Sequence, residues 1–125
     1  MENKPLTDIQ RLVYFTGERK TQIVLSQMRM DFCDLNGQLY NKLCVASPLC
    51  SCGDHIESPL HFFRSCRNYS AQRTLFLMSI HSTFGNVQIP ALEHILHGDP
   101  NMSLELNVKL CHLIHSFVKN TNRFK

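Results

Sequence analysis

Three cysteines and one histidine lie close together in the middle of the chain, at a spacing that suits a metal ion. Cys50, Cys52, His61 and Cys66 form the pattern Cys-x-Cys-x8-His-x4-Cys. Thiolate sulfur and imidazole nitrogen are ligands of tetrahedral zinc, and four protein ligands leave no position for a metal-bound water. The pattern therefore predicts one structural zinc ion rather than a catalytic one. The alternative is a chance grouping in a chain with six cysteines and seven histidines.

The segments around these ligands are those that a metal loop needs. Two cysteines separated by a single residue are closer than the usual zinc pair, so the chain must bend sharply, and Gly53 suits a tight turn with positive φ. Residues 58–65 are predicted to form a short helix, with a serine cap and proline at its first position. His61 and Cys66 are five residues apart, about 140° around an ideal helix. We therefore expect Cys66 where that helix ends.

Helical periodicity dominates the rest of the chain and predicts an all-α domain of about five to six helices, organised around the metal segment that itself carries the short helix at 58–65. Thr7 suits the cap of a first short helix, and Asn68 the cap of a later one. Beyond the first helix and the short helix at 58–65, the predicted helices cover about 18–31, 34–44, 69–84, 90–97 and 103–120. Strand-like alternation is nearly absent, apart from a small hairpin-like loop at about 45–57.

We predict a single domain over residues 1–125 that is organised by the metal. N-terminal helices would occupy residues 8–44, a zinc knuckle residues 45–67, and C-terminal helices residues 68–125. Leu35, Leu39 and Leu43 are expected to form an apolar stripe on the third helix. The zinc ion is expected to hold the N-terminal helices against the C-terminal ones, since structural zinc can supply on the order of 10 kcal/mol of folding free energy.

Composition favours a reducing, intracellular setting, either nuclear or cytoplasmic. The chain has 125 residues, 43% of them hydrophobic, which is enough for one core. No stretch approaches the ~18 uninterrupted apolar residues of a membrane span. The start, MENKPLTD, lacks the apolar region of a secretory signal. Three disulfides are the alternative use of six cysteines, but Cys50 and Cys52 are too close to join distant segments, so metal binding is favoured.

The basic residues are distributed in a way that is compatible with nucleic acid. The net charge is only +3, but residues 58–92 and 106–125 contain no Asp or Glu. Locally positive surface beside a zinc site suits phosphate contact. The candidate nucleic-acid-binding residues are Arg19, Lys20, Arg29, Arg64, Arg67 and Arg73. The alternative is a solvated surface, in which the arginines beside the metal offset the negative charge of three thiolates.

Other chemical groups have simpler interpretations. Two histidine pairs have a spacing that allows a second metal, although solvent-facing histidines are favoured. Two acidic pairs could act as general acid and base, although helix-end and turn roles are favoured. These pairs are His94/His97, His112/His115, Asp31/Asp34 and Asp54/Glu57.

The residues of the metal segment resemble a known family. The order is Ser47-Pro48-Leu49-Cys50-x-Cys52-Gly53, then Glu57, His61-Phe62-Phe63, Cys66, Tyr69 and Arg73. It is similar to the zinc-binding segment downstream of the polymerase in non-LTR retrotransposon reverse transcriptases. GERKTQIVLSQMRM upstream and LHGDPNMSLELN downstream extend the resemblance over about residues 12–124. It implies a C-terminal, non-catalytic, zinc-bound module that helps such a protein to handle RNA or DNA.

The chain departs from a full member of that family. It contains no Tyr-x-Asp-Asp polymerase signature and no recognisable endonuclease carboxylate cluster, so we expect no enzyme. It would be a truncated copy or a separately encoded remnant. The expected partners are RNA or DNA and an upstream reverse transcriptase domain, with no membrane and no small-molecule substrate. The alternative is a structural or protein-interaction module, stapled by zinc, that does not bind nucleic acid.

Overall fold

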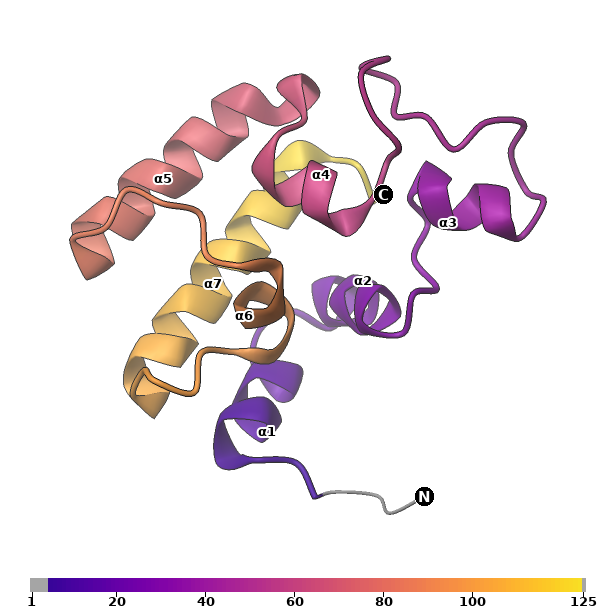
Figure 1. Ribbon diagram of the computed structural model, residues 1–125. Coiled ribbons are helices and arrows are strands. Elements are labelled where there is room, and N and C mark those ends of the chain that lie inside the picture. Colours follow the sequence, from indigo (N-terminus) through magenta and orange to yellow (C-terminus); the bar gives the residue numbers. More distant parts are fainter. Residues whose placement is uncertain (1–4, 125) are drawn as a thin grey trace.

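The computed structural model describes residues 5–124, which form helices joined by short loops (Figure 1). These residues contain seven α-helices and one 3₁₀ turn: α1 (Asp8–Phe15), α2 (Arg19–Arg29), α3 (Asn36–Asn41), α4 (Pro59–Arg64), η1 (Arg67–Tyr69), α5 (Ser70–Phe84), α6 (Leu92–His97) and α7 (Leu104–Thr121). The β pairing within this part of the chain is one isolated antiparallel bridge, between Leu49 and Ile56. The predicted all-α class is confirmed.

Local signals in the sequence account for several helix ends. Thr7 and Gln10 form a capping box at α1, in which each side chain bonds the backbone N–H of the other residue. Ser58 and Ser103 accept hydrogen bonds from the third residue of α4 and α7. Gly85 ends α5 in the left-handed conformation, with φ of 72°. These caps fix where the long helices and the ligand-bearing helix begin or end.

Two predictions about the middle of the chain are wrong. The third helix ends at Asn41, so Leu43 lies beyond it, 91% exposed and with φ of 61°, and the expected apolar stripe does not form. Asn68 does not cap a helix, because η1 precedes α5 and Tyr69 is the N-cap residue. The Asn68 amide instead donates to Ser51 Oγ at 2.8 Å.

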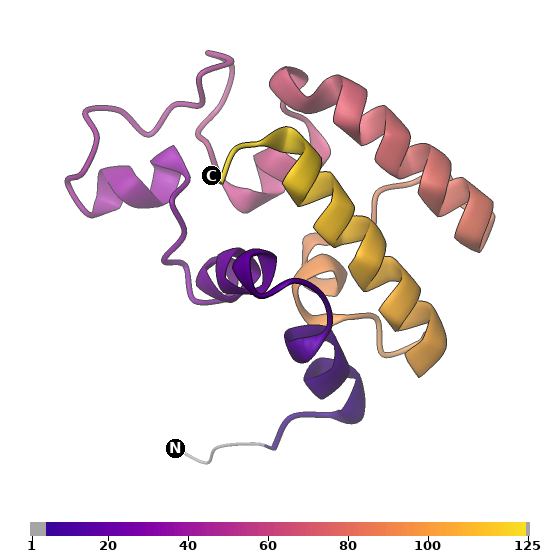
Figure 2. The same cartoon turned by 180° about the vertical axis from the view of Figure 1, so that it is seen from behind.

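The long helix α7 lies at the centre of the molecule. Helix α5 packs along one side of it, and α1 and α6 pack against it elsewhere, as Figures 1 and 2 show from opposite directions. The core between these helices is aromatic. Phe62 of α4 has its ring centroid 5.4 Å from that of Phe117, and Phe76 stacks on Phe117 at 5.3 Å. Such pairs add about 0.5–1.5 kcal/mol each to the free energy from apolar burial.

The first two helices reach the C-terminal helices without the metal segment. Helix α1 contacts α6 and α7 directly, and α2 contacts the same two helices. Zinc is therefore not needed to bring α1 and α2 against α6 and α7. Helix α3 differs, because it is bonded to the metal loop, where the Gly37 N–H donates to Glu57 O at 2.9 Å. The loop at 45–58, which carries Cys50 and Cys52, lies between α3 and α4 at the edge of the molecule (Figure 1). No helix among the described residues is both long and apolar enough to cross a membrane.

Candidate metal centre

The structure brings the four predicted ligands to one point. The ligand atoms of Cys50, Cys52, His61 and Cys66 all lie within 4.8 Å of one another, and all four residues are buried. The Cys50 and Cys66 sulfurs are 3.5 Å apart, and the Cys52 sulfur is 3.3 Å from His61 Nε2. Tetrahedral zinc would separate two sulfurs by about 3.8 Å and a sulfur from a nitrogen by about 3.6 Å. The cluster therefore has the donor set and nearly the dimensions of a four-ligand metal site.

A short hairpin shapes the two-cysteine side of the site. The Cys50 N–H donates to His55 O at 2.8 Å, and the Gly53 N–H donates to Cys50 O at 2.9 Å. Gly53 adopts φ of 83°, as its position after Cys52 predicts, and this closes the turn. The turn compensates for the unusually short interval between the two cysteines.

Helix α4 supplies the other two ligands. His61 lies on the helix, and Cys66 follows its end, as the five-residue separation predicts. The ring of His61 is oriented through Nδ1, which lies 3.1 Å from Ser65 Oγ, so Nε2 faces the sulfurs. Phe62, next to His61, is fully buried in the aromatic core. The core therefore anchors the helix that carries the ligands.

The electrostatics of the cluster differ from ligand to ligand. Burial raises the pKa of Cys50 to about 12. Hydrogen bonding from the Asp54 N–H lowers the pKa of Cys52 and favours its thiolate. Burial, together with neighbouring His55, lowers the pKa of His61 and keeps its ring neutral, as metal coordination requires. The disfavoured alternative use of the six cysteines, disulfide bonding, does not occur, since all six are free.

A buried ion pair ties the metal loop to the end of the chain. Glu57 is 2% exposed and accepts two hydrogen bonds from Arg123, at 2.7 and 3.0 Å, and one from the Asn36 N–H at 2.7 Å. Burial alone would raise the pKa of Glu57, but these bonds outweigh it and hold the pKa below its usual value. Its carboxylate also lies 3.8 Å from the Cys50 sulfur. Glu57 is thus a support of the site rather than a general acid or base.

Arg73 has a structural role that differs from the predicted one. Its side chain is 9% exposed, and it donates to the carbonyls of Phe62 at 3.1 Å, Phe63 at 3.0 Å and Cys66 at 2.9 Å. These three bonds satisfy carbonyl groups at the C-terminal end of α4 and hold in place the residues just after the helix, which include Cys66. The expectation that Arg73 contacts nucleic acid is therefore wrong, because its donors are buried and used.

Of the remaining basic candidates, four are exposed and one is engaged in contacts within the protein. Arg19, Lys20, Arg64 and Arg67 are exposed. Arg67 also donates to the Cys52 carbonyl and lies 3.7 Å from Asp54, which places it directly beside the metal loop. Arg29 is half-buried, bonds the Leu96 carbonyl and lies 4.2 Å over the Tyr14 ring. Arg29 is thus a contact between helices and is a poor candidate for phosphate binding.

The histidine pairs form no second metal site in the described part of the chain. Among residues 5–124, the cysteine–histidine cluster is the one group of three or more such side chains that could hold an ion. His94 Nδ1 faces Asp99 Oδ2 at 3.7 Å, and His97 Nδ1 bonds the Tyr14 hydroxyl at 2.6 Å. His115 is buried, and neither of its ring nitrogens has a hydrogen-bond partner.

Sequence reasoning missed two parts of the site. Arg123 lies 66 positions from Glu57, and no local pattern indicates that they pair. The hydrogen bonds of Arg73 span 7 to 11 positions. They were not predicted, because an arginine in a segment without acidic residues also suits a basic surface. No protein-family model, curated protein or solved structure matches this chain.

Proposed function

We propose that this chain is a non-catalytic module that binds one structural zinc ion and, through exposed arginines and lysines, RNA or DNA. The observation that carries the proposal is the buried cluster of Cys50, Cys52, His61 and Cys66, with all ligand atoms within 4.8 Å. Three sulfurs and one imidazole nitrogen favour zinc over hard cations such as magnesium, which prefer oxygen ligands. Four protein ligands fill the shell, so the ion would stabilise the fold without activating water.

The surroundings of the cluster fit a negatively charged metal site. Zinc with three thiolates would carry a net charge of about −1. Arg67 bonds the carbonyl of Cys52, and Arg73 bonds that of Cys66, so two cations lie beside the ligands. Ser65 orients the His61 ring through a hydrogen bond to Nδ1, the nitrogen that does not face the sulfurs, and metal-bound histidines are commonly held in this way.

The nucleic-acid part of the proposal depends on the exposed basic residues. Arg64 and Arg67 flank the α4 exit that carries Cys66, within a segment without acidic residues. Arg19 and Lys20 begin α2 and are exposed. The resemblance of residues 47–73 to the zinc segment of non-LTR retrotransposon reverse transcriptases supports binding to an RNA or DNA template. Contacts through phosphates would give weak binding without strong sequence preference.

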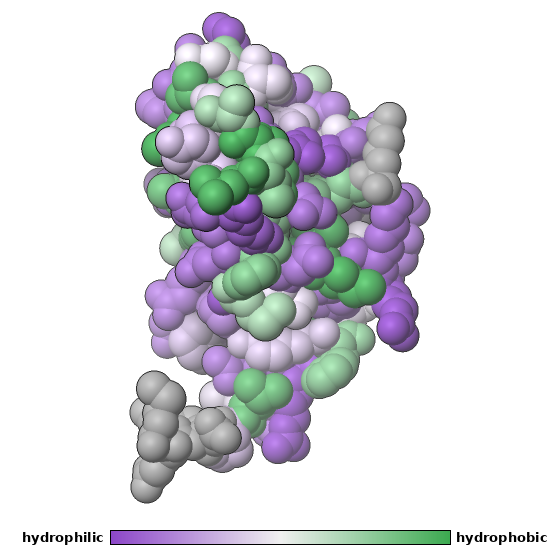
Figure 3. Space-filling view, turned by 90° about the vertical axis from the view of Figure 1, so that its right-hand side faces the viewer, coloured by the Kyte–Doolittle hydropathy of each residue, from purple (hydrophilic) through white to green (hydrophobic). Residues whose placement is uncertain are grey.

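A second candidate function, protein interaction, is favoured by helix α5. Its outer side exposes Leu75 and Met78, at 57% and 62%, and Arg73, the one Lys, Arg, Asp or Glu of the helix, is buried. A shallow hollow beside α7 is lined by Leu75 and Leu113. By contrast, the face in Figure 3 carries hydrophobic side chains in separate groups among hydrophilic ones. The uncharged α5 surface suits an upstream protein domain rather than a phosphate backbone.

Fluorescence anisotropy with labelled single-stranded RNA and DNA, over a series of salt concentrations, tests the nucleic-acid proposal. About four phosphate contacts to a single strand would give a log–log salt slope of about −3, at roughly 0.7 per contact. Replacing Arg64 and Arg67 together by alanine should lower the magnitude of the slope by about 1.4, because about one phosphate contact is lost per residue. Arg11→Ala, an exposed arginine of α1, is the matched control and should leave the slope unchanged. No binding at low salt would favour the protein-interaction function.

A further inference from the structure

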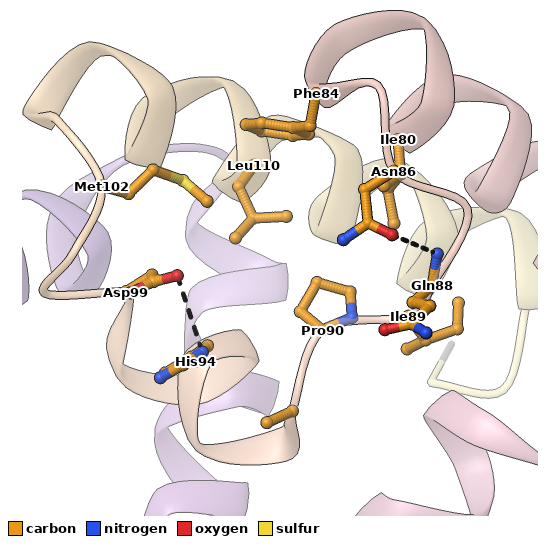
Figure 4. A pocket seen from close by; sticks show the side chains of 11 residues that line it. Ile80, Phe84, Asn86, Gln88, Ile89, Pro90, His94, Asp99, Met102 and Leu110 are labelled. Carbon is orange, nitrogen blue, oxygen red and sulfur yellow. Dashed lines mark hydrogen bonds and ion pairs between the residues drawn. The ribbon is translucent and has the colours of Figure 1, made fainter.

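A cavity of about 250 Å³ lies on a different part of the molecule from the metal centre. It is partly open and is bordered by the C-terminal half of α5, the loop at 86–91, α6, the loop at 98–103 and Leu110 of α7 (Figure 4). It shares no residue with the metal site. A water molecule has about 30 Å³ of liquid volume, so the cavity has room for a compact organic molecule of roughly ten non-hydrogen atoms.

The walls of the cavity are largely apolar, with polar groups at two places. Ile80, Phe84, Ile89 and Leu110 form apolar surface. Figure 4 shows Asn86 and Gln88 beside Ile80 and Ile89, where Asn86 Oδ1 accepts the Gln88 N–H at 3.0 Å, and Asp99 and His94 together on the opposite side, which is the charged polar end. An apolar enclosure with a few convergent polar groups is the usual composition of a small-molecule site. The apolar walls favour a ligand with a hydrophobic body, and the polar end determines the charge of the head group that it binds.

The polar end carries a negative charge that protein groups only partly satisfy. Asp99 is the one Asp, Glu, Lys or Arg among the described residues that line the cavity. Its Oδ1 accepts the Asn101 N–H at 2.9 Å, whereas Oδ2 lies 3.7 Å from His94 Nδ1, beyond hydrogen-bond distance. The side chain of Asp99 is only 21% exposed, so water screens its carboxylate incompletely. The free lone pairs of Oδ2 therefore favour a cationic donor.

We propose that this cavity binds small amines with an apolar body, the ammonium group donating to Asp99 Oδ2 and the body lying against Phe84, Ile80 and Leu110. A carboxylate ligand is disfavoured, because it would face Asp99 with like charge. A neutral ligand of the same shape would keep the apolar contacts but lose the charge-assisted hydrogen bond. For a ligand of nine non-hydrogen atoms, this predicts a Kd of about 1 mM.

Phenethylamine and 2-phenylethanol are the probes, because they have the same number of non-hydrogen atoms and differ in charge. Each is titrated at pH 7.5 into zinc-loaded, ¹⁵N-labelled full chain, and amide shifts are followed by NMR. Phenethylamine should shift the amides of 84–102 with saturation, and the alcohol should bind about tenfold more weakly. Asp99→Asn keeps the acceptor for the Asn101 N–H but removes the charge, so it should abolish the tenfold preference while leaving the affinity for the alcohol unchanged.

A second variant guards against the case in which Asp99→Asn disturbs the loop. Met102→Trp adds bulk from a half-buried loop position that lines the cavity, and it should weaken both probes at least tenfold while the thermal midpoint stays within a few degrees. The inference is overturned if neither probe shifts these amides, if both bind the wild type equally, or if phenethylamine binds Asp99→Asn as tightly as wild type. These outcomes are independent of metal and nucleic-acid binding.

Discussion

Replacing Arg73 by methionine should destabilise the protein more than any exposed arginine substitution. The guanidinium donates to the carbonyls of Phe62, Phe63 and Cys66. The Cys66 carbonyl would keep the hydrogen bond from the Tyr69 N–H at 3.2 Å. The Phe62 and Phe63 carbonyls, at the end of a six-residue helix, would be left without this donor. Each unsatisfied buried carbonyl costs about 1–3 kcal/mol, so we expect a total of about 2–6 kcal/mol for the two.

The same substitution should weaken metal binding, because Arg73 holds the exit of α4 on which Cys66 lies. Loss of a supporting contact of this kind lowers metal affinity by about 10–100-fold. Urea denaturation of the zinc-loaded protein measures the free energy of unfolding, and competition with a chromophoric chelator measures the zinc Kd. Arg64→Met is the matched control, since Arg64 is exposed on the same helix end, and it should change stability by about 0.5 kcal/mol or less.

The reasoning is refuted if Arg73→Met unfolds at the same urea concentration as Arg64→Met and retains the wild-type zinc affinity. Arg73→Lys separates charge from geometry. A lysine ammonium cannot reach three carbonyls as the planar guanidinium does, so it should recover only part of the lost stability. Full recovery would mean that the positive charge near the thiolates, rather than the three hydrogen bonds, is what stabilises the site.

Two further predictions concern buried titratable groups. Glu57→Gln should lower the free energy of unfolding at pH 7 by about 2 kcal/mol, since it removes the charge that pairs with Arg123. The folded-state pKa of Glu57 is lowered, so this stabilisation is present above the unfolded-state pKa of about 4.3 and is lost as the pH falls below that value. Urea denaturation should therefore show a smaller difference in the free energy of unfolding between variant and wild type at pH 3 than at pH 7. An equal difference at both pH values would contradict this prediction. His115→Leu should stabilise the protein by about 1 kcal/mol, because it removes two unpartnered buried nitrogens, whereas His112→Leu on the exposed side of α7 should change little. Burial lowers the pKa of His115, so the unfolded chain binds more protons than the folded one below about pH 6.5, and the wild type loses stability there. Thermal scans from pH 8 to pH 5 should show a smaller fall in the unfolding midpoint for His115→Leu than for wild type. An equal fall would count against the interpretation.

The metal ligands and most helix caps could be predicted because their signals are local. Cys50 and Cys66 belong to one short segment, and the caps at Thr7 and Ser58 depend on residues three positions away. In such cases both partners of a hydrogen bond, or all ligands of a metal, lie close together in the sequence, so their spacing can be recognised. The fold class followed equally from the helical period of the apolar residues.

The support of the site could not be predicted, because it depends on contacts between distant positions. Glu57 pairs with Arg123 across 66 positions, and the choice of Arg123 over other nearby cations is a matter of packing. Leu43 was expected in a buried stripe because it continues a four-residue spacing, yet its helix stops at Asn41. Periodicity alone cannot say where a short helix ends when neither a glycine nor a proline follows directly.

The most direct test of the metal centre is zinc content by native mass spectrometry of wild type, Cys52→Ser and Cys44→Ser. Cys44 is an exposed cysteine outside the cluster and provides the matched control. We predict one zinc ion per chain in wild type and in Cys44→Ser, and loss of the ion in Cys52→Ser together with a fall in helical circular dichroism. Wild-type protein without zinc after purification in zinc-containing medium, or equal zinc content in all three proteins, would contradict the assignment.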